Sequence, residues 1–116
     1  MTAQITPPPE TSLLCIEAAT NHDVLELRLA GEMDLSTRGE LAAAFAALEH
    51  GSTTSVSLDL AALEFCDASG IAELVTVRKA AARTGRRLAT HGMGPQVGRL
   101  LWLTGTAGFL GAVLTH

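Results

Sequence analysis

A chain of 116 residues is long enough to bury one hydrophobic core and too short for two ordinary domains. Hydrophobic residues make up 47% of the chain and charged residues 17%, which indicates a folded protein and excludes an intrinsically disordered one. The net charge is -4. Every acidic side chain lies in residues 1–77, and the charged side chains of residues 78–116 are all basic. Because aromatic residues make up only 3% of the chain, this basic cluster does not indicate a nucleic-acid-binding surface.

The first twelve residues contain three consecutive prolines and lack the basic segment and long apolar run of a secretory signal. We therefore predict a disordered leader over residues 1–12, a single domain over residues 13–116 and a cytoplasmic location. Cys15 and Cys66 lie in predicted strands, and two cysteines in a cytosolic chain are more often buried thiols than a disulfide.

Two runs with strand periodicity, residues 13–18 and 24–31, are separated by the turn-like sequence ATNHD and predict a hairpin. In the second run, leucines alternate with Glu26 and Arg28, so one face of this strand is expected to be buried and the other polar.

The period then changes to that of a helix over residues 35–50. Thr37 and Glu40 have the spacing of a capping box at the beginning of this helix, and Gly51 is expected to end it. The residues predicted to lie on its buried face are Leu41, Phe45 and Leu48.

The second half of the chain continues to alternate strands with helices. We predict a strand over residues 55–65, a helix over 71–84, a short strand over 86–90 and a helix over 95–103. Residues 108–114 are compatible with a final strand. The charge-free end of the chain is shorter than the roughly 20 apolar residues that span a bilayer, so we expect no membrane insertion.

This order predicts an α/β fold: a mixed, mostly parallel sheet with an N-terminal hairpin and three to four packed helices. Each strand-helix-strand unit implies parallel strands joined by a right-handed crossover. The strand-to-helix turns at residues 31–37 and 66–70 then emerge at the same carboxyl edge of the sheet, where α/β proteins generally bind their ligands and partners.

The residues at this edge do not form a catalytic or metal-binding pattern. The sequence DASGI differs from the G-x-S-x-G elbow of serine hydrolases, and no histidine lies near either turn. The four histidines lack metal-ligand spacing, and the glycines of residues 92–98 do not match a dinucleotide-binding loop. We therefore expect neither an enzyme nor a metal or cofactor site.

Polar and small residues at the edge are candidate partner-binding residues. Asp67 is expected to cap its helix, Ser69 to lie in the first turn, and Gly70 to let a partner's backbone come close. A phosphate on Ser69 would add negative charge beside Asp67 and near Asp34 and Glu32, and would oppose whatever the unmodified surface binds. The pattern predicts a switchable docking surface.

Trp102 points away from the apolar face of the last predicted helix, at 100° per residue. An exposed tryptophan is a candidate anchor for a protein interface. Packing of Trp102 against the C-terminal segment is the alternative, and the sequence does not decide between the two.

Three segments together resemble the STAS family, and most closely its bacterial anti-sigma factor antagonists: LAGEMDLST (29–37), VSLDLAALEFCDASGIAEL (56–74) and GPQVGRLLWLTG (94–105). The resemblance implies a small α/β binding protein that docks on an anti-sigma factor, itself a serine kinase, and so frees a sigma factor. It also implies that phosphorylation ends the docking and that a PP2C-type phosphatase restores it.

The family usually carries its phosphorylated Ser or Thr directly after the aspartate, in D-[S/T]-[S/T]-G, and this chain has Ala68 there. Ser69 accepts the phosphate in a shifted register, or the switch is lost, or the chain belongs to another STAS branch. Loss of the switch is favoured, because alanine offers no oxygen to the γ-phosphate. The resemblance also makes Glu32 and Asp34 candidate partner contacts.

Two other functions stay open beside the antagonist. One is an accessory STAS subunit of a membrane lipid ABC transporter, which docks on an ATPase without phosphorylation; Ala68 favours it, whereas the GEMD turn (31–34) favours the antagonist. The other is a small-ligand or nucleotide sensor, which no basic or glycine-rich phosphate cradle supports.

Overall fold

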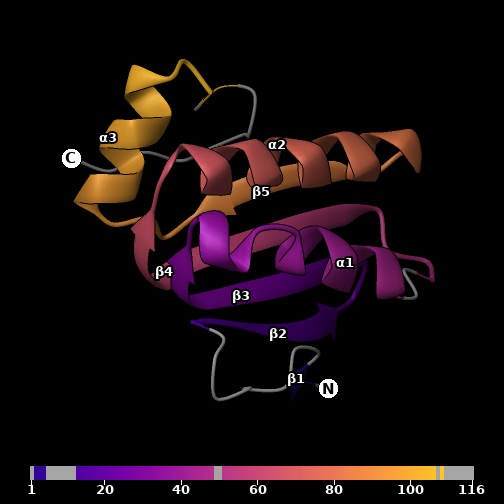
Figure 1. Cartoon of the computed structure of the whole chain (residues 1–116). Helices are drawn as coiled ribbons and strands as arrows, with labels where there is room; N and C mark the ends of the chain where they lie inside the picture. The colour runs from indigo at the N-terminus through magenta and orange to yellow at the C-terminus, as the bar shows by residue number, and fades with distance from the viewer. Residues whose placement is uncertain (1, 5–12, 49–50, 107, 109–116) are drawn as a thin grey trace.

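The computed structural model describes residues 2–4, 13–48, 51–106 and 108 (Figure 1). In chain order its elements are β1 (Thr2–Gln4), β2 (Leu14–Asn21), β3 (Val24–Met33), the 3-10 turn η1 (Leu35–Thr37), α1 (Glu40–Ala47), β4 (Ser55–Cys66), α2 (Ala68–Arg83), β5 (Arg87–His91) and α3 (Pro95–Leu103). The predicted order of hairpin, helix, strand, helix, strand and helix is confirmed, as is the α/β class.

The strands form one sheet in the order β1-β2-β3-β4-β5. β2 is antiparallel to both β1 and β3, whereas β4 is parallel to both β3 and β5. Figure 1 shows α1 and α2 side by side over one face of the sheet, with α3 beyond the carboxyl end of β4, near the beginning of α2. The helices therefore leave the opposite face of the sheet uncovered, among the elements that the structure describes.

The N-terminal residues differ from the prediction of a disordered leader. Thr2–Gln4 form β1, which pairs with residues 17–19 of β2 and satisfies backbone groups that would otherwise lie unpaired at the edge of the sheet. Residues 1 and 5–12 lie outside the described residues. So does the strand expected over residues 108–114, apart from Gly108.

The first helix begins later than predicted, because residues 35–37 form a separate 3-10 turn. Thr37 does not cap α1 with Glu40, so the capping box predicted there is wrong. Thr37 is instead the third residue of η1, in a capping box with Asp34. Gly39, with a φ of 88°, separates η1 from α1, and this left-handed conformation is one that glycine adopts without strain.

The same helix also ends earlier than predicted. Its last residue is Ala47, and Leu48 takes an extended conformation with its amide bonded to the carbonyl of Phe45. The helix therefore stops before Gly51, which is not its terminator.

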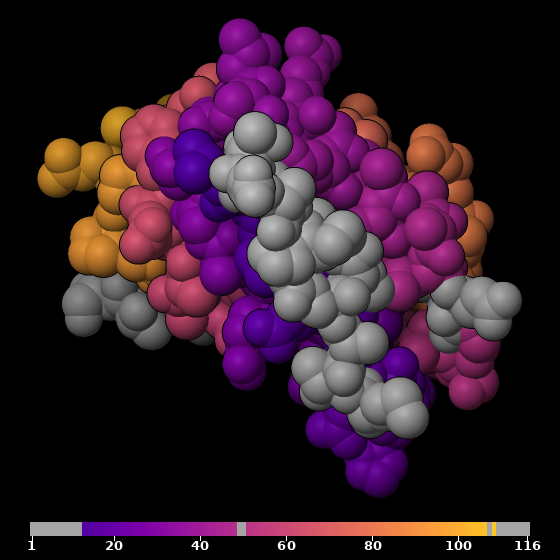
Figure 2. Space-filling model, turned by 60° about the horizontal axis from the view of Figure 1, so that its bottom comes forward, coloured from indigo at the N-terminus to yellow at the C-terminus, as the bar shows by residue number. Residues whose placement is uncertain are grey.

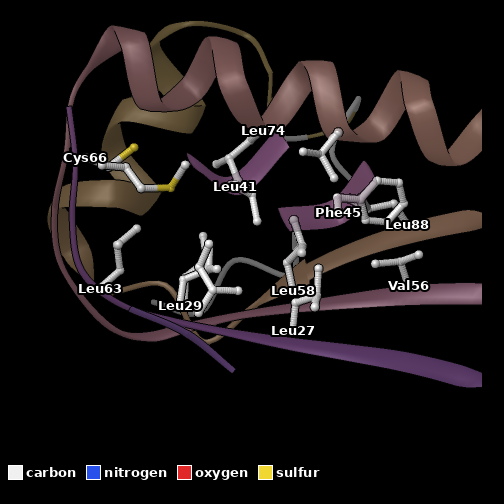
Figure 3. Packing of buried hydrophobic residues seen from close by; sticks show 14 of the residues in the cluster. Leu27, Leu29, Leu41, Phe45, Val56, Leu58, Leu63, Cys66, Leu74 and Leu88 are labelled. Atoms are coloured by element: carbon white, nitrogen blue, oxygen red, sulfur yellow. The ribbon is translucent and has the colours of Figure 1, made fainter. Parts of the chain in front are cut away.

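A leucine-rich core fills the space between the sheet and the helices. The alternation predicted for β3 is confirmed, because its leucines are buried while Glu26 and Arg28 are exposed. Figure 3 shows side chains from the strands meeting those of α1 and α2. Burial of each such side chain contributes on the order of 2 kcal/mol. The labelled core residues are Leu27, Leu29, Leu41, Phe45, Val56, Leu58, Leu63, Cys66, Leu74 and Leu88.

Both cysteines are free, as expected; Cys66 is buried and Cys15 half-buried. None of the helices in the described ranges has the length and apolar character needed to cross a membrane.

Candidate functional site

The two strand-to-helix turns lie next to each other at the carboxyl edge of the sheet, as predicted. β3 and β4 run parallel, and Met33 at the end of β3 is the register partner of Cys66 at the end of β4. The amide of Asp67 donates a 3.2 Å hydrogen bond to the carbonyl of Met33. This bond joins the second turn directly to the strand that leads into the first.

Each turn contains the same Asp-x-Ser arrangement. In the first, Asp34 Oδ1 accepts hydrogen bonds from the Ser36 amide at 2.9 Å and the Ser36 hydroxyl at 2.6 Å. In the second, Asp67 Oδ1 accepts from the Ser69 amide and the Ser69 hydroxyl, both at 2.9 Å. Ser36 was not among the predicted site residues, although the repeated Asp-x-Ser spacing in MDLS and CDAS is a signal that identifies it.

Asp67 is the N-cap of α2, as expected. Besides the Ser69 amide, its Oδ1 accepts the amide of Gly70 at 3.2 Å. These amides have no partner within the helix, and a carboxylate at this end also opposes the helix dipole favourably.

Asp34 is held in its ionised form by its neighbours. The Ser36 hydroxyl, which donates to the carboxylate, lowers the pKa of Asp34 below its ordinary value of 3.8, partial desolvation opposes this, and the amides of Ser36 and Thr37 lower the pKa further. The buried Thr37 hydroxyl holds the backbone of the same turn: it accepts a hydrogen bond from the Asp34 amide at 3.0 Å and donates one to the Glu32 carbonyl at 3.1 Å. The edge therefore presents a negative charge on a well-defined backbone.

Ala68 and Ser69 differ in how they meet solvent. Ala68 is exposed at the first position of α2, whereas Ser69 is half-buried and its hydroxyl donates to Asp67. The exposed position of this turn, Ala68, therefore has no hydroxyl, and the Ser69 hydroxyl is part of the helix cap.

Gly70 has a different role from the predicted one. A Cβ atom at this position would lie 2.6 Å from Cys66 Sγ and 2.8 Å from both Cβ and the carbonyl oxygen of Met33. Gly70 is buried, so it allows α2 to come close to β3 and β4 of its own chain. The expectation that it leaves room for a partner's backbone is corrected, because the space beside it is already filled.

Helix α3 is attached to this edge by Gln96, which was not among the predicted site residues. The side-chain amide of Gln96 donates to the Cys66 carbonyl at 3.0 Å and accepts from the Cys66 amide at 3.4 Å. β4 pairs with β5 only as far as Asp59, so Gln96 takes the place of a strand neighbour at the end of β4. Figure 2 shows the yellow residues of α3 and the pink residues near the beginning of α2 on the same side of the molecule.

Apolar side chains are exposed around the acidic turns. Trp102 on α3 is 72% exposed, which was one of the two alternatives left open for it, and its neighbour Leu103 is equally exposed. Leu35 in η1 is 70% exposed, and Phe65 at the end of β4 is 40% exposed. Leu35 and Phe65 therefore place exposed apolar side chains in or beside the acidic turns.

The chemistry of the edge is that of a binding surface. No three His, Cys, Asp or Glu side chains in the described part of the chain are grouped to hold a metal ion. Burial, together with the charges of Asp67 and Glu73, raises the pKa of the Cys66 thiol to about 12, so Cys66 is not a nucleophile at neutral pH. The fold is of the α/β class, and this edge carries two Asp-capped turns on neighbouring strand ends.

The comparisons with known proteins agree with this class. A family model described as "Mlab, STAS domain" matches residues 16–114, so the chain belongs to the STAS domain family. The anti-sigma-B factor antagonist of Staphylococcus epidermidis is 30% identical over 92 residues, which cover 79% of this chain and 85% of that protein. The predicted resemblance is therefore confirmed, and the chain is a homologue of the non-enzymatic anti-sigma factor antagonists, which act by partner switching.

Solved structures show the same fold. An anti-sigma factor antagonist from Mycobacterium paratuberculosis superposes with a TM-score of 0.71 at 22% identity, over 88% of this chain and 86% of that one. The anti-sigma factor antagonist SpoIIAA in its unphosphorylated form gives a TM-score of 0.63 at 17% identity, over 85% and 88% of the two chains.

Proposed function

We propose that this protein is a cytoplasmic anti-sigma factor antagonist that docks on an anti-sigma factor with serine kinase activity and so releases a sigma factor. The docking surface is the carboxyl edge of the sheet, formed by Glu32, Asp34, Asp67 and Ala68, with Trp102 at its margin. The observation that carries the proposal is the pair of Asp-capped turns on adjacent strand ends, in a chain homologous to such antagonists.

The charges at this edge indicate the chemistry of the partner surface. Among the described residues, an ion pair with its charged atoms within 4.0 Å of each other joins Arg28 and Asp59. Glu32, Asp34 and Asp67 form no ion pair with other described residues. These carboxylates are available to lysine or arginine side chains of a partner, which would speed association and orient the complex. The exposed apolar residues beside them supply area that a partner can bury.

Ala68 determines how this antagonist would respond to the kinase. Its exposed position carries no oxygen, and the neighbouring Ser69 hydroxyl is bonded to Asp67. A kinase must place the γ-phosphate of ATP in line with an accepting oxygen. We therefore expect docking that the kinase does not switch off, and no PP2C-type phosphatase is then needed to restore it.

Binding can be measured with the purified anti-sigma factor by following the fluorescence of Trp102, the single tryptophan of the chain. Asp34→Lys and Ser69→Asp are expected to weaken binding about tenfold or more while circular dichroism stays unchanged. Glu26→Lys, on the uncovered sheet face, is the charge-matched control for Asp34→Lys and should bind normally. Unchanged affinity in both edge variants would place the interface elsewhere.

The missing acceptor is tested by Ala68→Ser. This variant should gain one phosphate in the presence of the kinase and ATP, read as a mass increase in the peptide that contains position 68. The wild-type chain should remain unmodified under the same conditions. Failure of Ala68→Ser to accept phosphate would show that alanine is not the reason for insensitivity.

A second candidate function rests on the same alanine. An accessory STAS subunit that docks on a transporter ATPase needs no phosphoacceptor, and Ala68 fits that role as well. Affinity purification of the tagged chain from native lysate, with mass spectrometry of its companions and of Ser69, separates the two. A serine-kinase anti-sigma factor supports the antagonist, whereas a transporter ATPase without phosphate on Ser69 would replace it.

A further inference from the structure

One row of polar side chains crosses the uncovered face of the sheet; its three charged members alternate in sign, and His91 ends the row. The strand register pairs Glu17 with Arg28, Arg28 with Asp59, and Asp59 with His91. Residues paired directly across neighbouring strands point to the same face. In each of these strands the residues before and after the row member in the chain are buried toward the helices, except Gly92, which follows β5. The side chains of the row therefore point away from the core.

The charges of this row are only partly satisfied within the chain. Arg28 Nε lies 3.6 Å from Asp59 Oδ2, and the two side chains are 63% and 27% exposed. His91 Nε2 lies 2.7 Å from the Ser57 hydroxyl. The row also lines a shallow hollow of about 220 Å³, and its outermost acid, Glu17, forms no ion pair with the described residues.

We propose that this face binds a second copy of the same chain, about a two-fold axis that runs parallel to the strands between β3 and β4. This rotation reverses the order of the strands in the facing copy. Arg28 of each copy then faces Asp59 of the other, and Glu17 faces His91. A two-fold axis across the strands would place each charge opposite itself, so the alternation selects one orientation.

The neighbouring row fits the same arrangement. It consists of Ala19, Glu26, Ser57 and Ala89, which are also register partners. The same rotation places Glu26 opposite Ser57, which can donate a hydrogen bond, and places the two alanines opposite each other. Small residues at the ends of the row let two sheets approach to the ordinary spacing of about 10 Å. No like charges meet in either row.

The size of the face makes this dimer weak. Four strands spaced about 4.8 Å apart, over about seven residues each, offer on the order of 400 Å² per copy, which is small among specific interfaces. The hollow at its centre keeps the interface wet. We therefore expect a reversible dimer that added salt dissociates, because its pairs lie near solvent.

The dimer adds to the proposed function without depending on it. The axis is parallel to the strands, so the carboxyl edges of both copies point in the same direction and stay free. Two docking edges side by side suit two partner molecules or a partner that is itself a dimer. Variants of the uncovered face are expected to leave the docking affinity of each edge unchanged, so failure of either proposal can be recognised separately.

A charge-complementation experiment tests the dimer by sedimentation equilibrium of the full chain at low and high salt. Arg28→Glu and Asp59→Arg should each raise the dimer Kd about tenfold or more, because each places like charges opposite each other twice. An equimolar mixture of the two variants should dimerise again. In the mixed dimer the new glutamate faces the new arginine, and the unchanged Asp59 faces the unchanged Arg28.

Arg38→Glu and Glu64→Arg are controls with the same changes of charge at exposed positions outside the row, and they should dimerise like the wild type. A wild-type chain that stays monomeric at millimolar concentration would overturn the proposal, as would a mixture that stays monomeric while both variants are folded. Asp59 Oδ1 also accepts a hydrogen bond from the Ala61 amide, so Asp59→Arg can fail to fold. In that case the dimer is tested by the exposed Arg28→Glu variant and by the salt dependence of the wild-type dimer.

Discussion

Glu73 on α2 caps the neighbouring helix α1: its Oε2 accepts a 3.0 Å hydrogen bond from the amide of Ala42. Gly39, the residue before α1, has no side chain to satisfy the first-turn amides. Glu73 is only 7% exposed, so its carboxylate lies between the two helices. Because α1 and α2 follow the two acidic turns at the carboxyl edge of the sheet, this bond holds the turns in a fixed relative position.

Glu73→Ala is expected to lower the free energy of unfolding by about 2 kcal/mol, because it leaves the amide of Ala42 without its acceptor. Glu73→Gln keeps an acceptor oxygen and should lose less. Both are measured by urea denaturation. Lys79→Ala on the exposed face of the same helix is the control, with an expected change within about 0.5 kcal/mol. Equal losses for Glu73→Ala and Lys79→Ala would show that the cap does not contribute.

Gly70→Ala is expected to destabilise the fold by about 1–3 kcal/mol, because the new methyl group would overlap Cys66 Sγ and the Met33 backbone. Gly94→Ala is the matched control, since a Cβ there meets no atom within 4 Å and the φ of Gly94 is -74°. It should cost about 0.5–1 kcal/mol, less than Gly70→Ala, because Gly94 is the N-cap of α3 and alanine is a poorer N-cap than glycine. Thermal unfolding compares the two, and similar midpoints would contradict the tight packing at Gly70.

Thr37→Val removes a buried hydroxyl while keeping the shape of the side chain. The amide of Asp34 then loses its bond to Thr37 Oγ1, which we expect to cost about 1–3 kcal/mol of stability and to loosen the acidic turn. Thr37→Ser should lose less, because it keeps the oxygen. Thr76→Val removes an exposed hydroxyl from α2 and serves as control. Hydrogen exchange of the Asp34 amide should be faster in Thr37→Val than in the wild type, and unchanged in Thr76→Val. An unchanged exchange rate of the Asp34 amide in Thr37→Val would refute the role of the hydroxyl.

The buried thiol of Cys66 predicts a loss of stability in alkali. Its pKa is raised to about 12, from 9.0 for an unperturbed thiol, so between these values the unfolded chain releases a proton that the folded chain keeps. Its contribution is fully present below pH 9 and is lost as the pH rises toward 12, with a slope of at most about 1.4 kcal/mol per pH unit.

The alkaline slope can be assigned to Cys66 by comparing urea denaturation of the wild type and Cys66→Ala at pH 8, 9 and 10. The chain contains no tyrosine, which simplifies this pH range. Cys15 and the single lysine are present in both proteins, so they do not distinguish the two curves. Cys66→Ala should be less stable at pH 8 but lose stability less steeply as the pH rises; parallel curves would contradict the shifted pKa.

Local features of this protein were readable from its sequence. The bounds of α3 agree with the prediction of residues 95–103, because Pro95 begins the helix and the apolar period continues to Leu103. Asp67 was recognised as a helix cap from its position before a helical run. Alternating leucines placed the buried face of β3 correctly. Each of these signals lies within a few residues of the feature that it predicts.

The boundary between η1 and α1 was misplaced for a non-local reason. Thr37 and Glu40 have the spacing of a capping box, but Thr37 is buried and bonded to the backbone at Glu32 and Asp34. The Ala42 amide of α1 donates instead to Glu73, which is 31 residues away in the chain. Spacing along the sequence does not reveal a cap supplied by another helix.

The α/β order, the family and the acidic edge formed by the two strand-to-helix turns could be predicted from the sequence, because periodicity, motifs and turn composition are local signals. Three relationships could be seen only in the folded chain: the packing role of Gly70, the attachment of α3 to β4 by Gln96, and the alignment of a polar row across four strands. These relationships depend on strand register and helix docking, which bring together atoms that are distant in the chain.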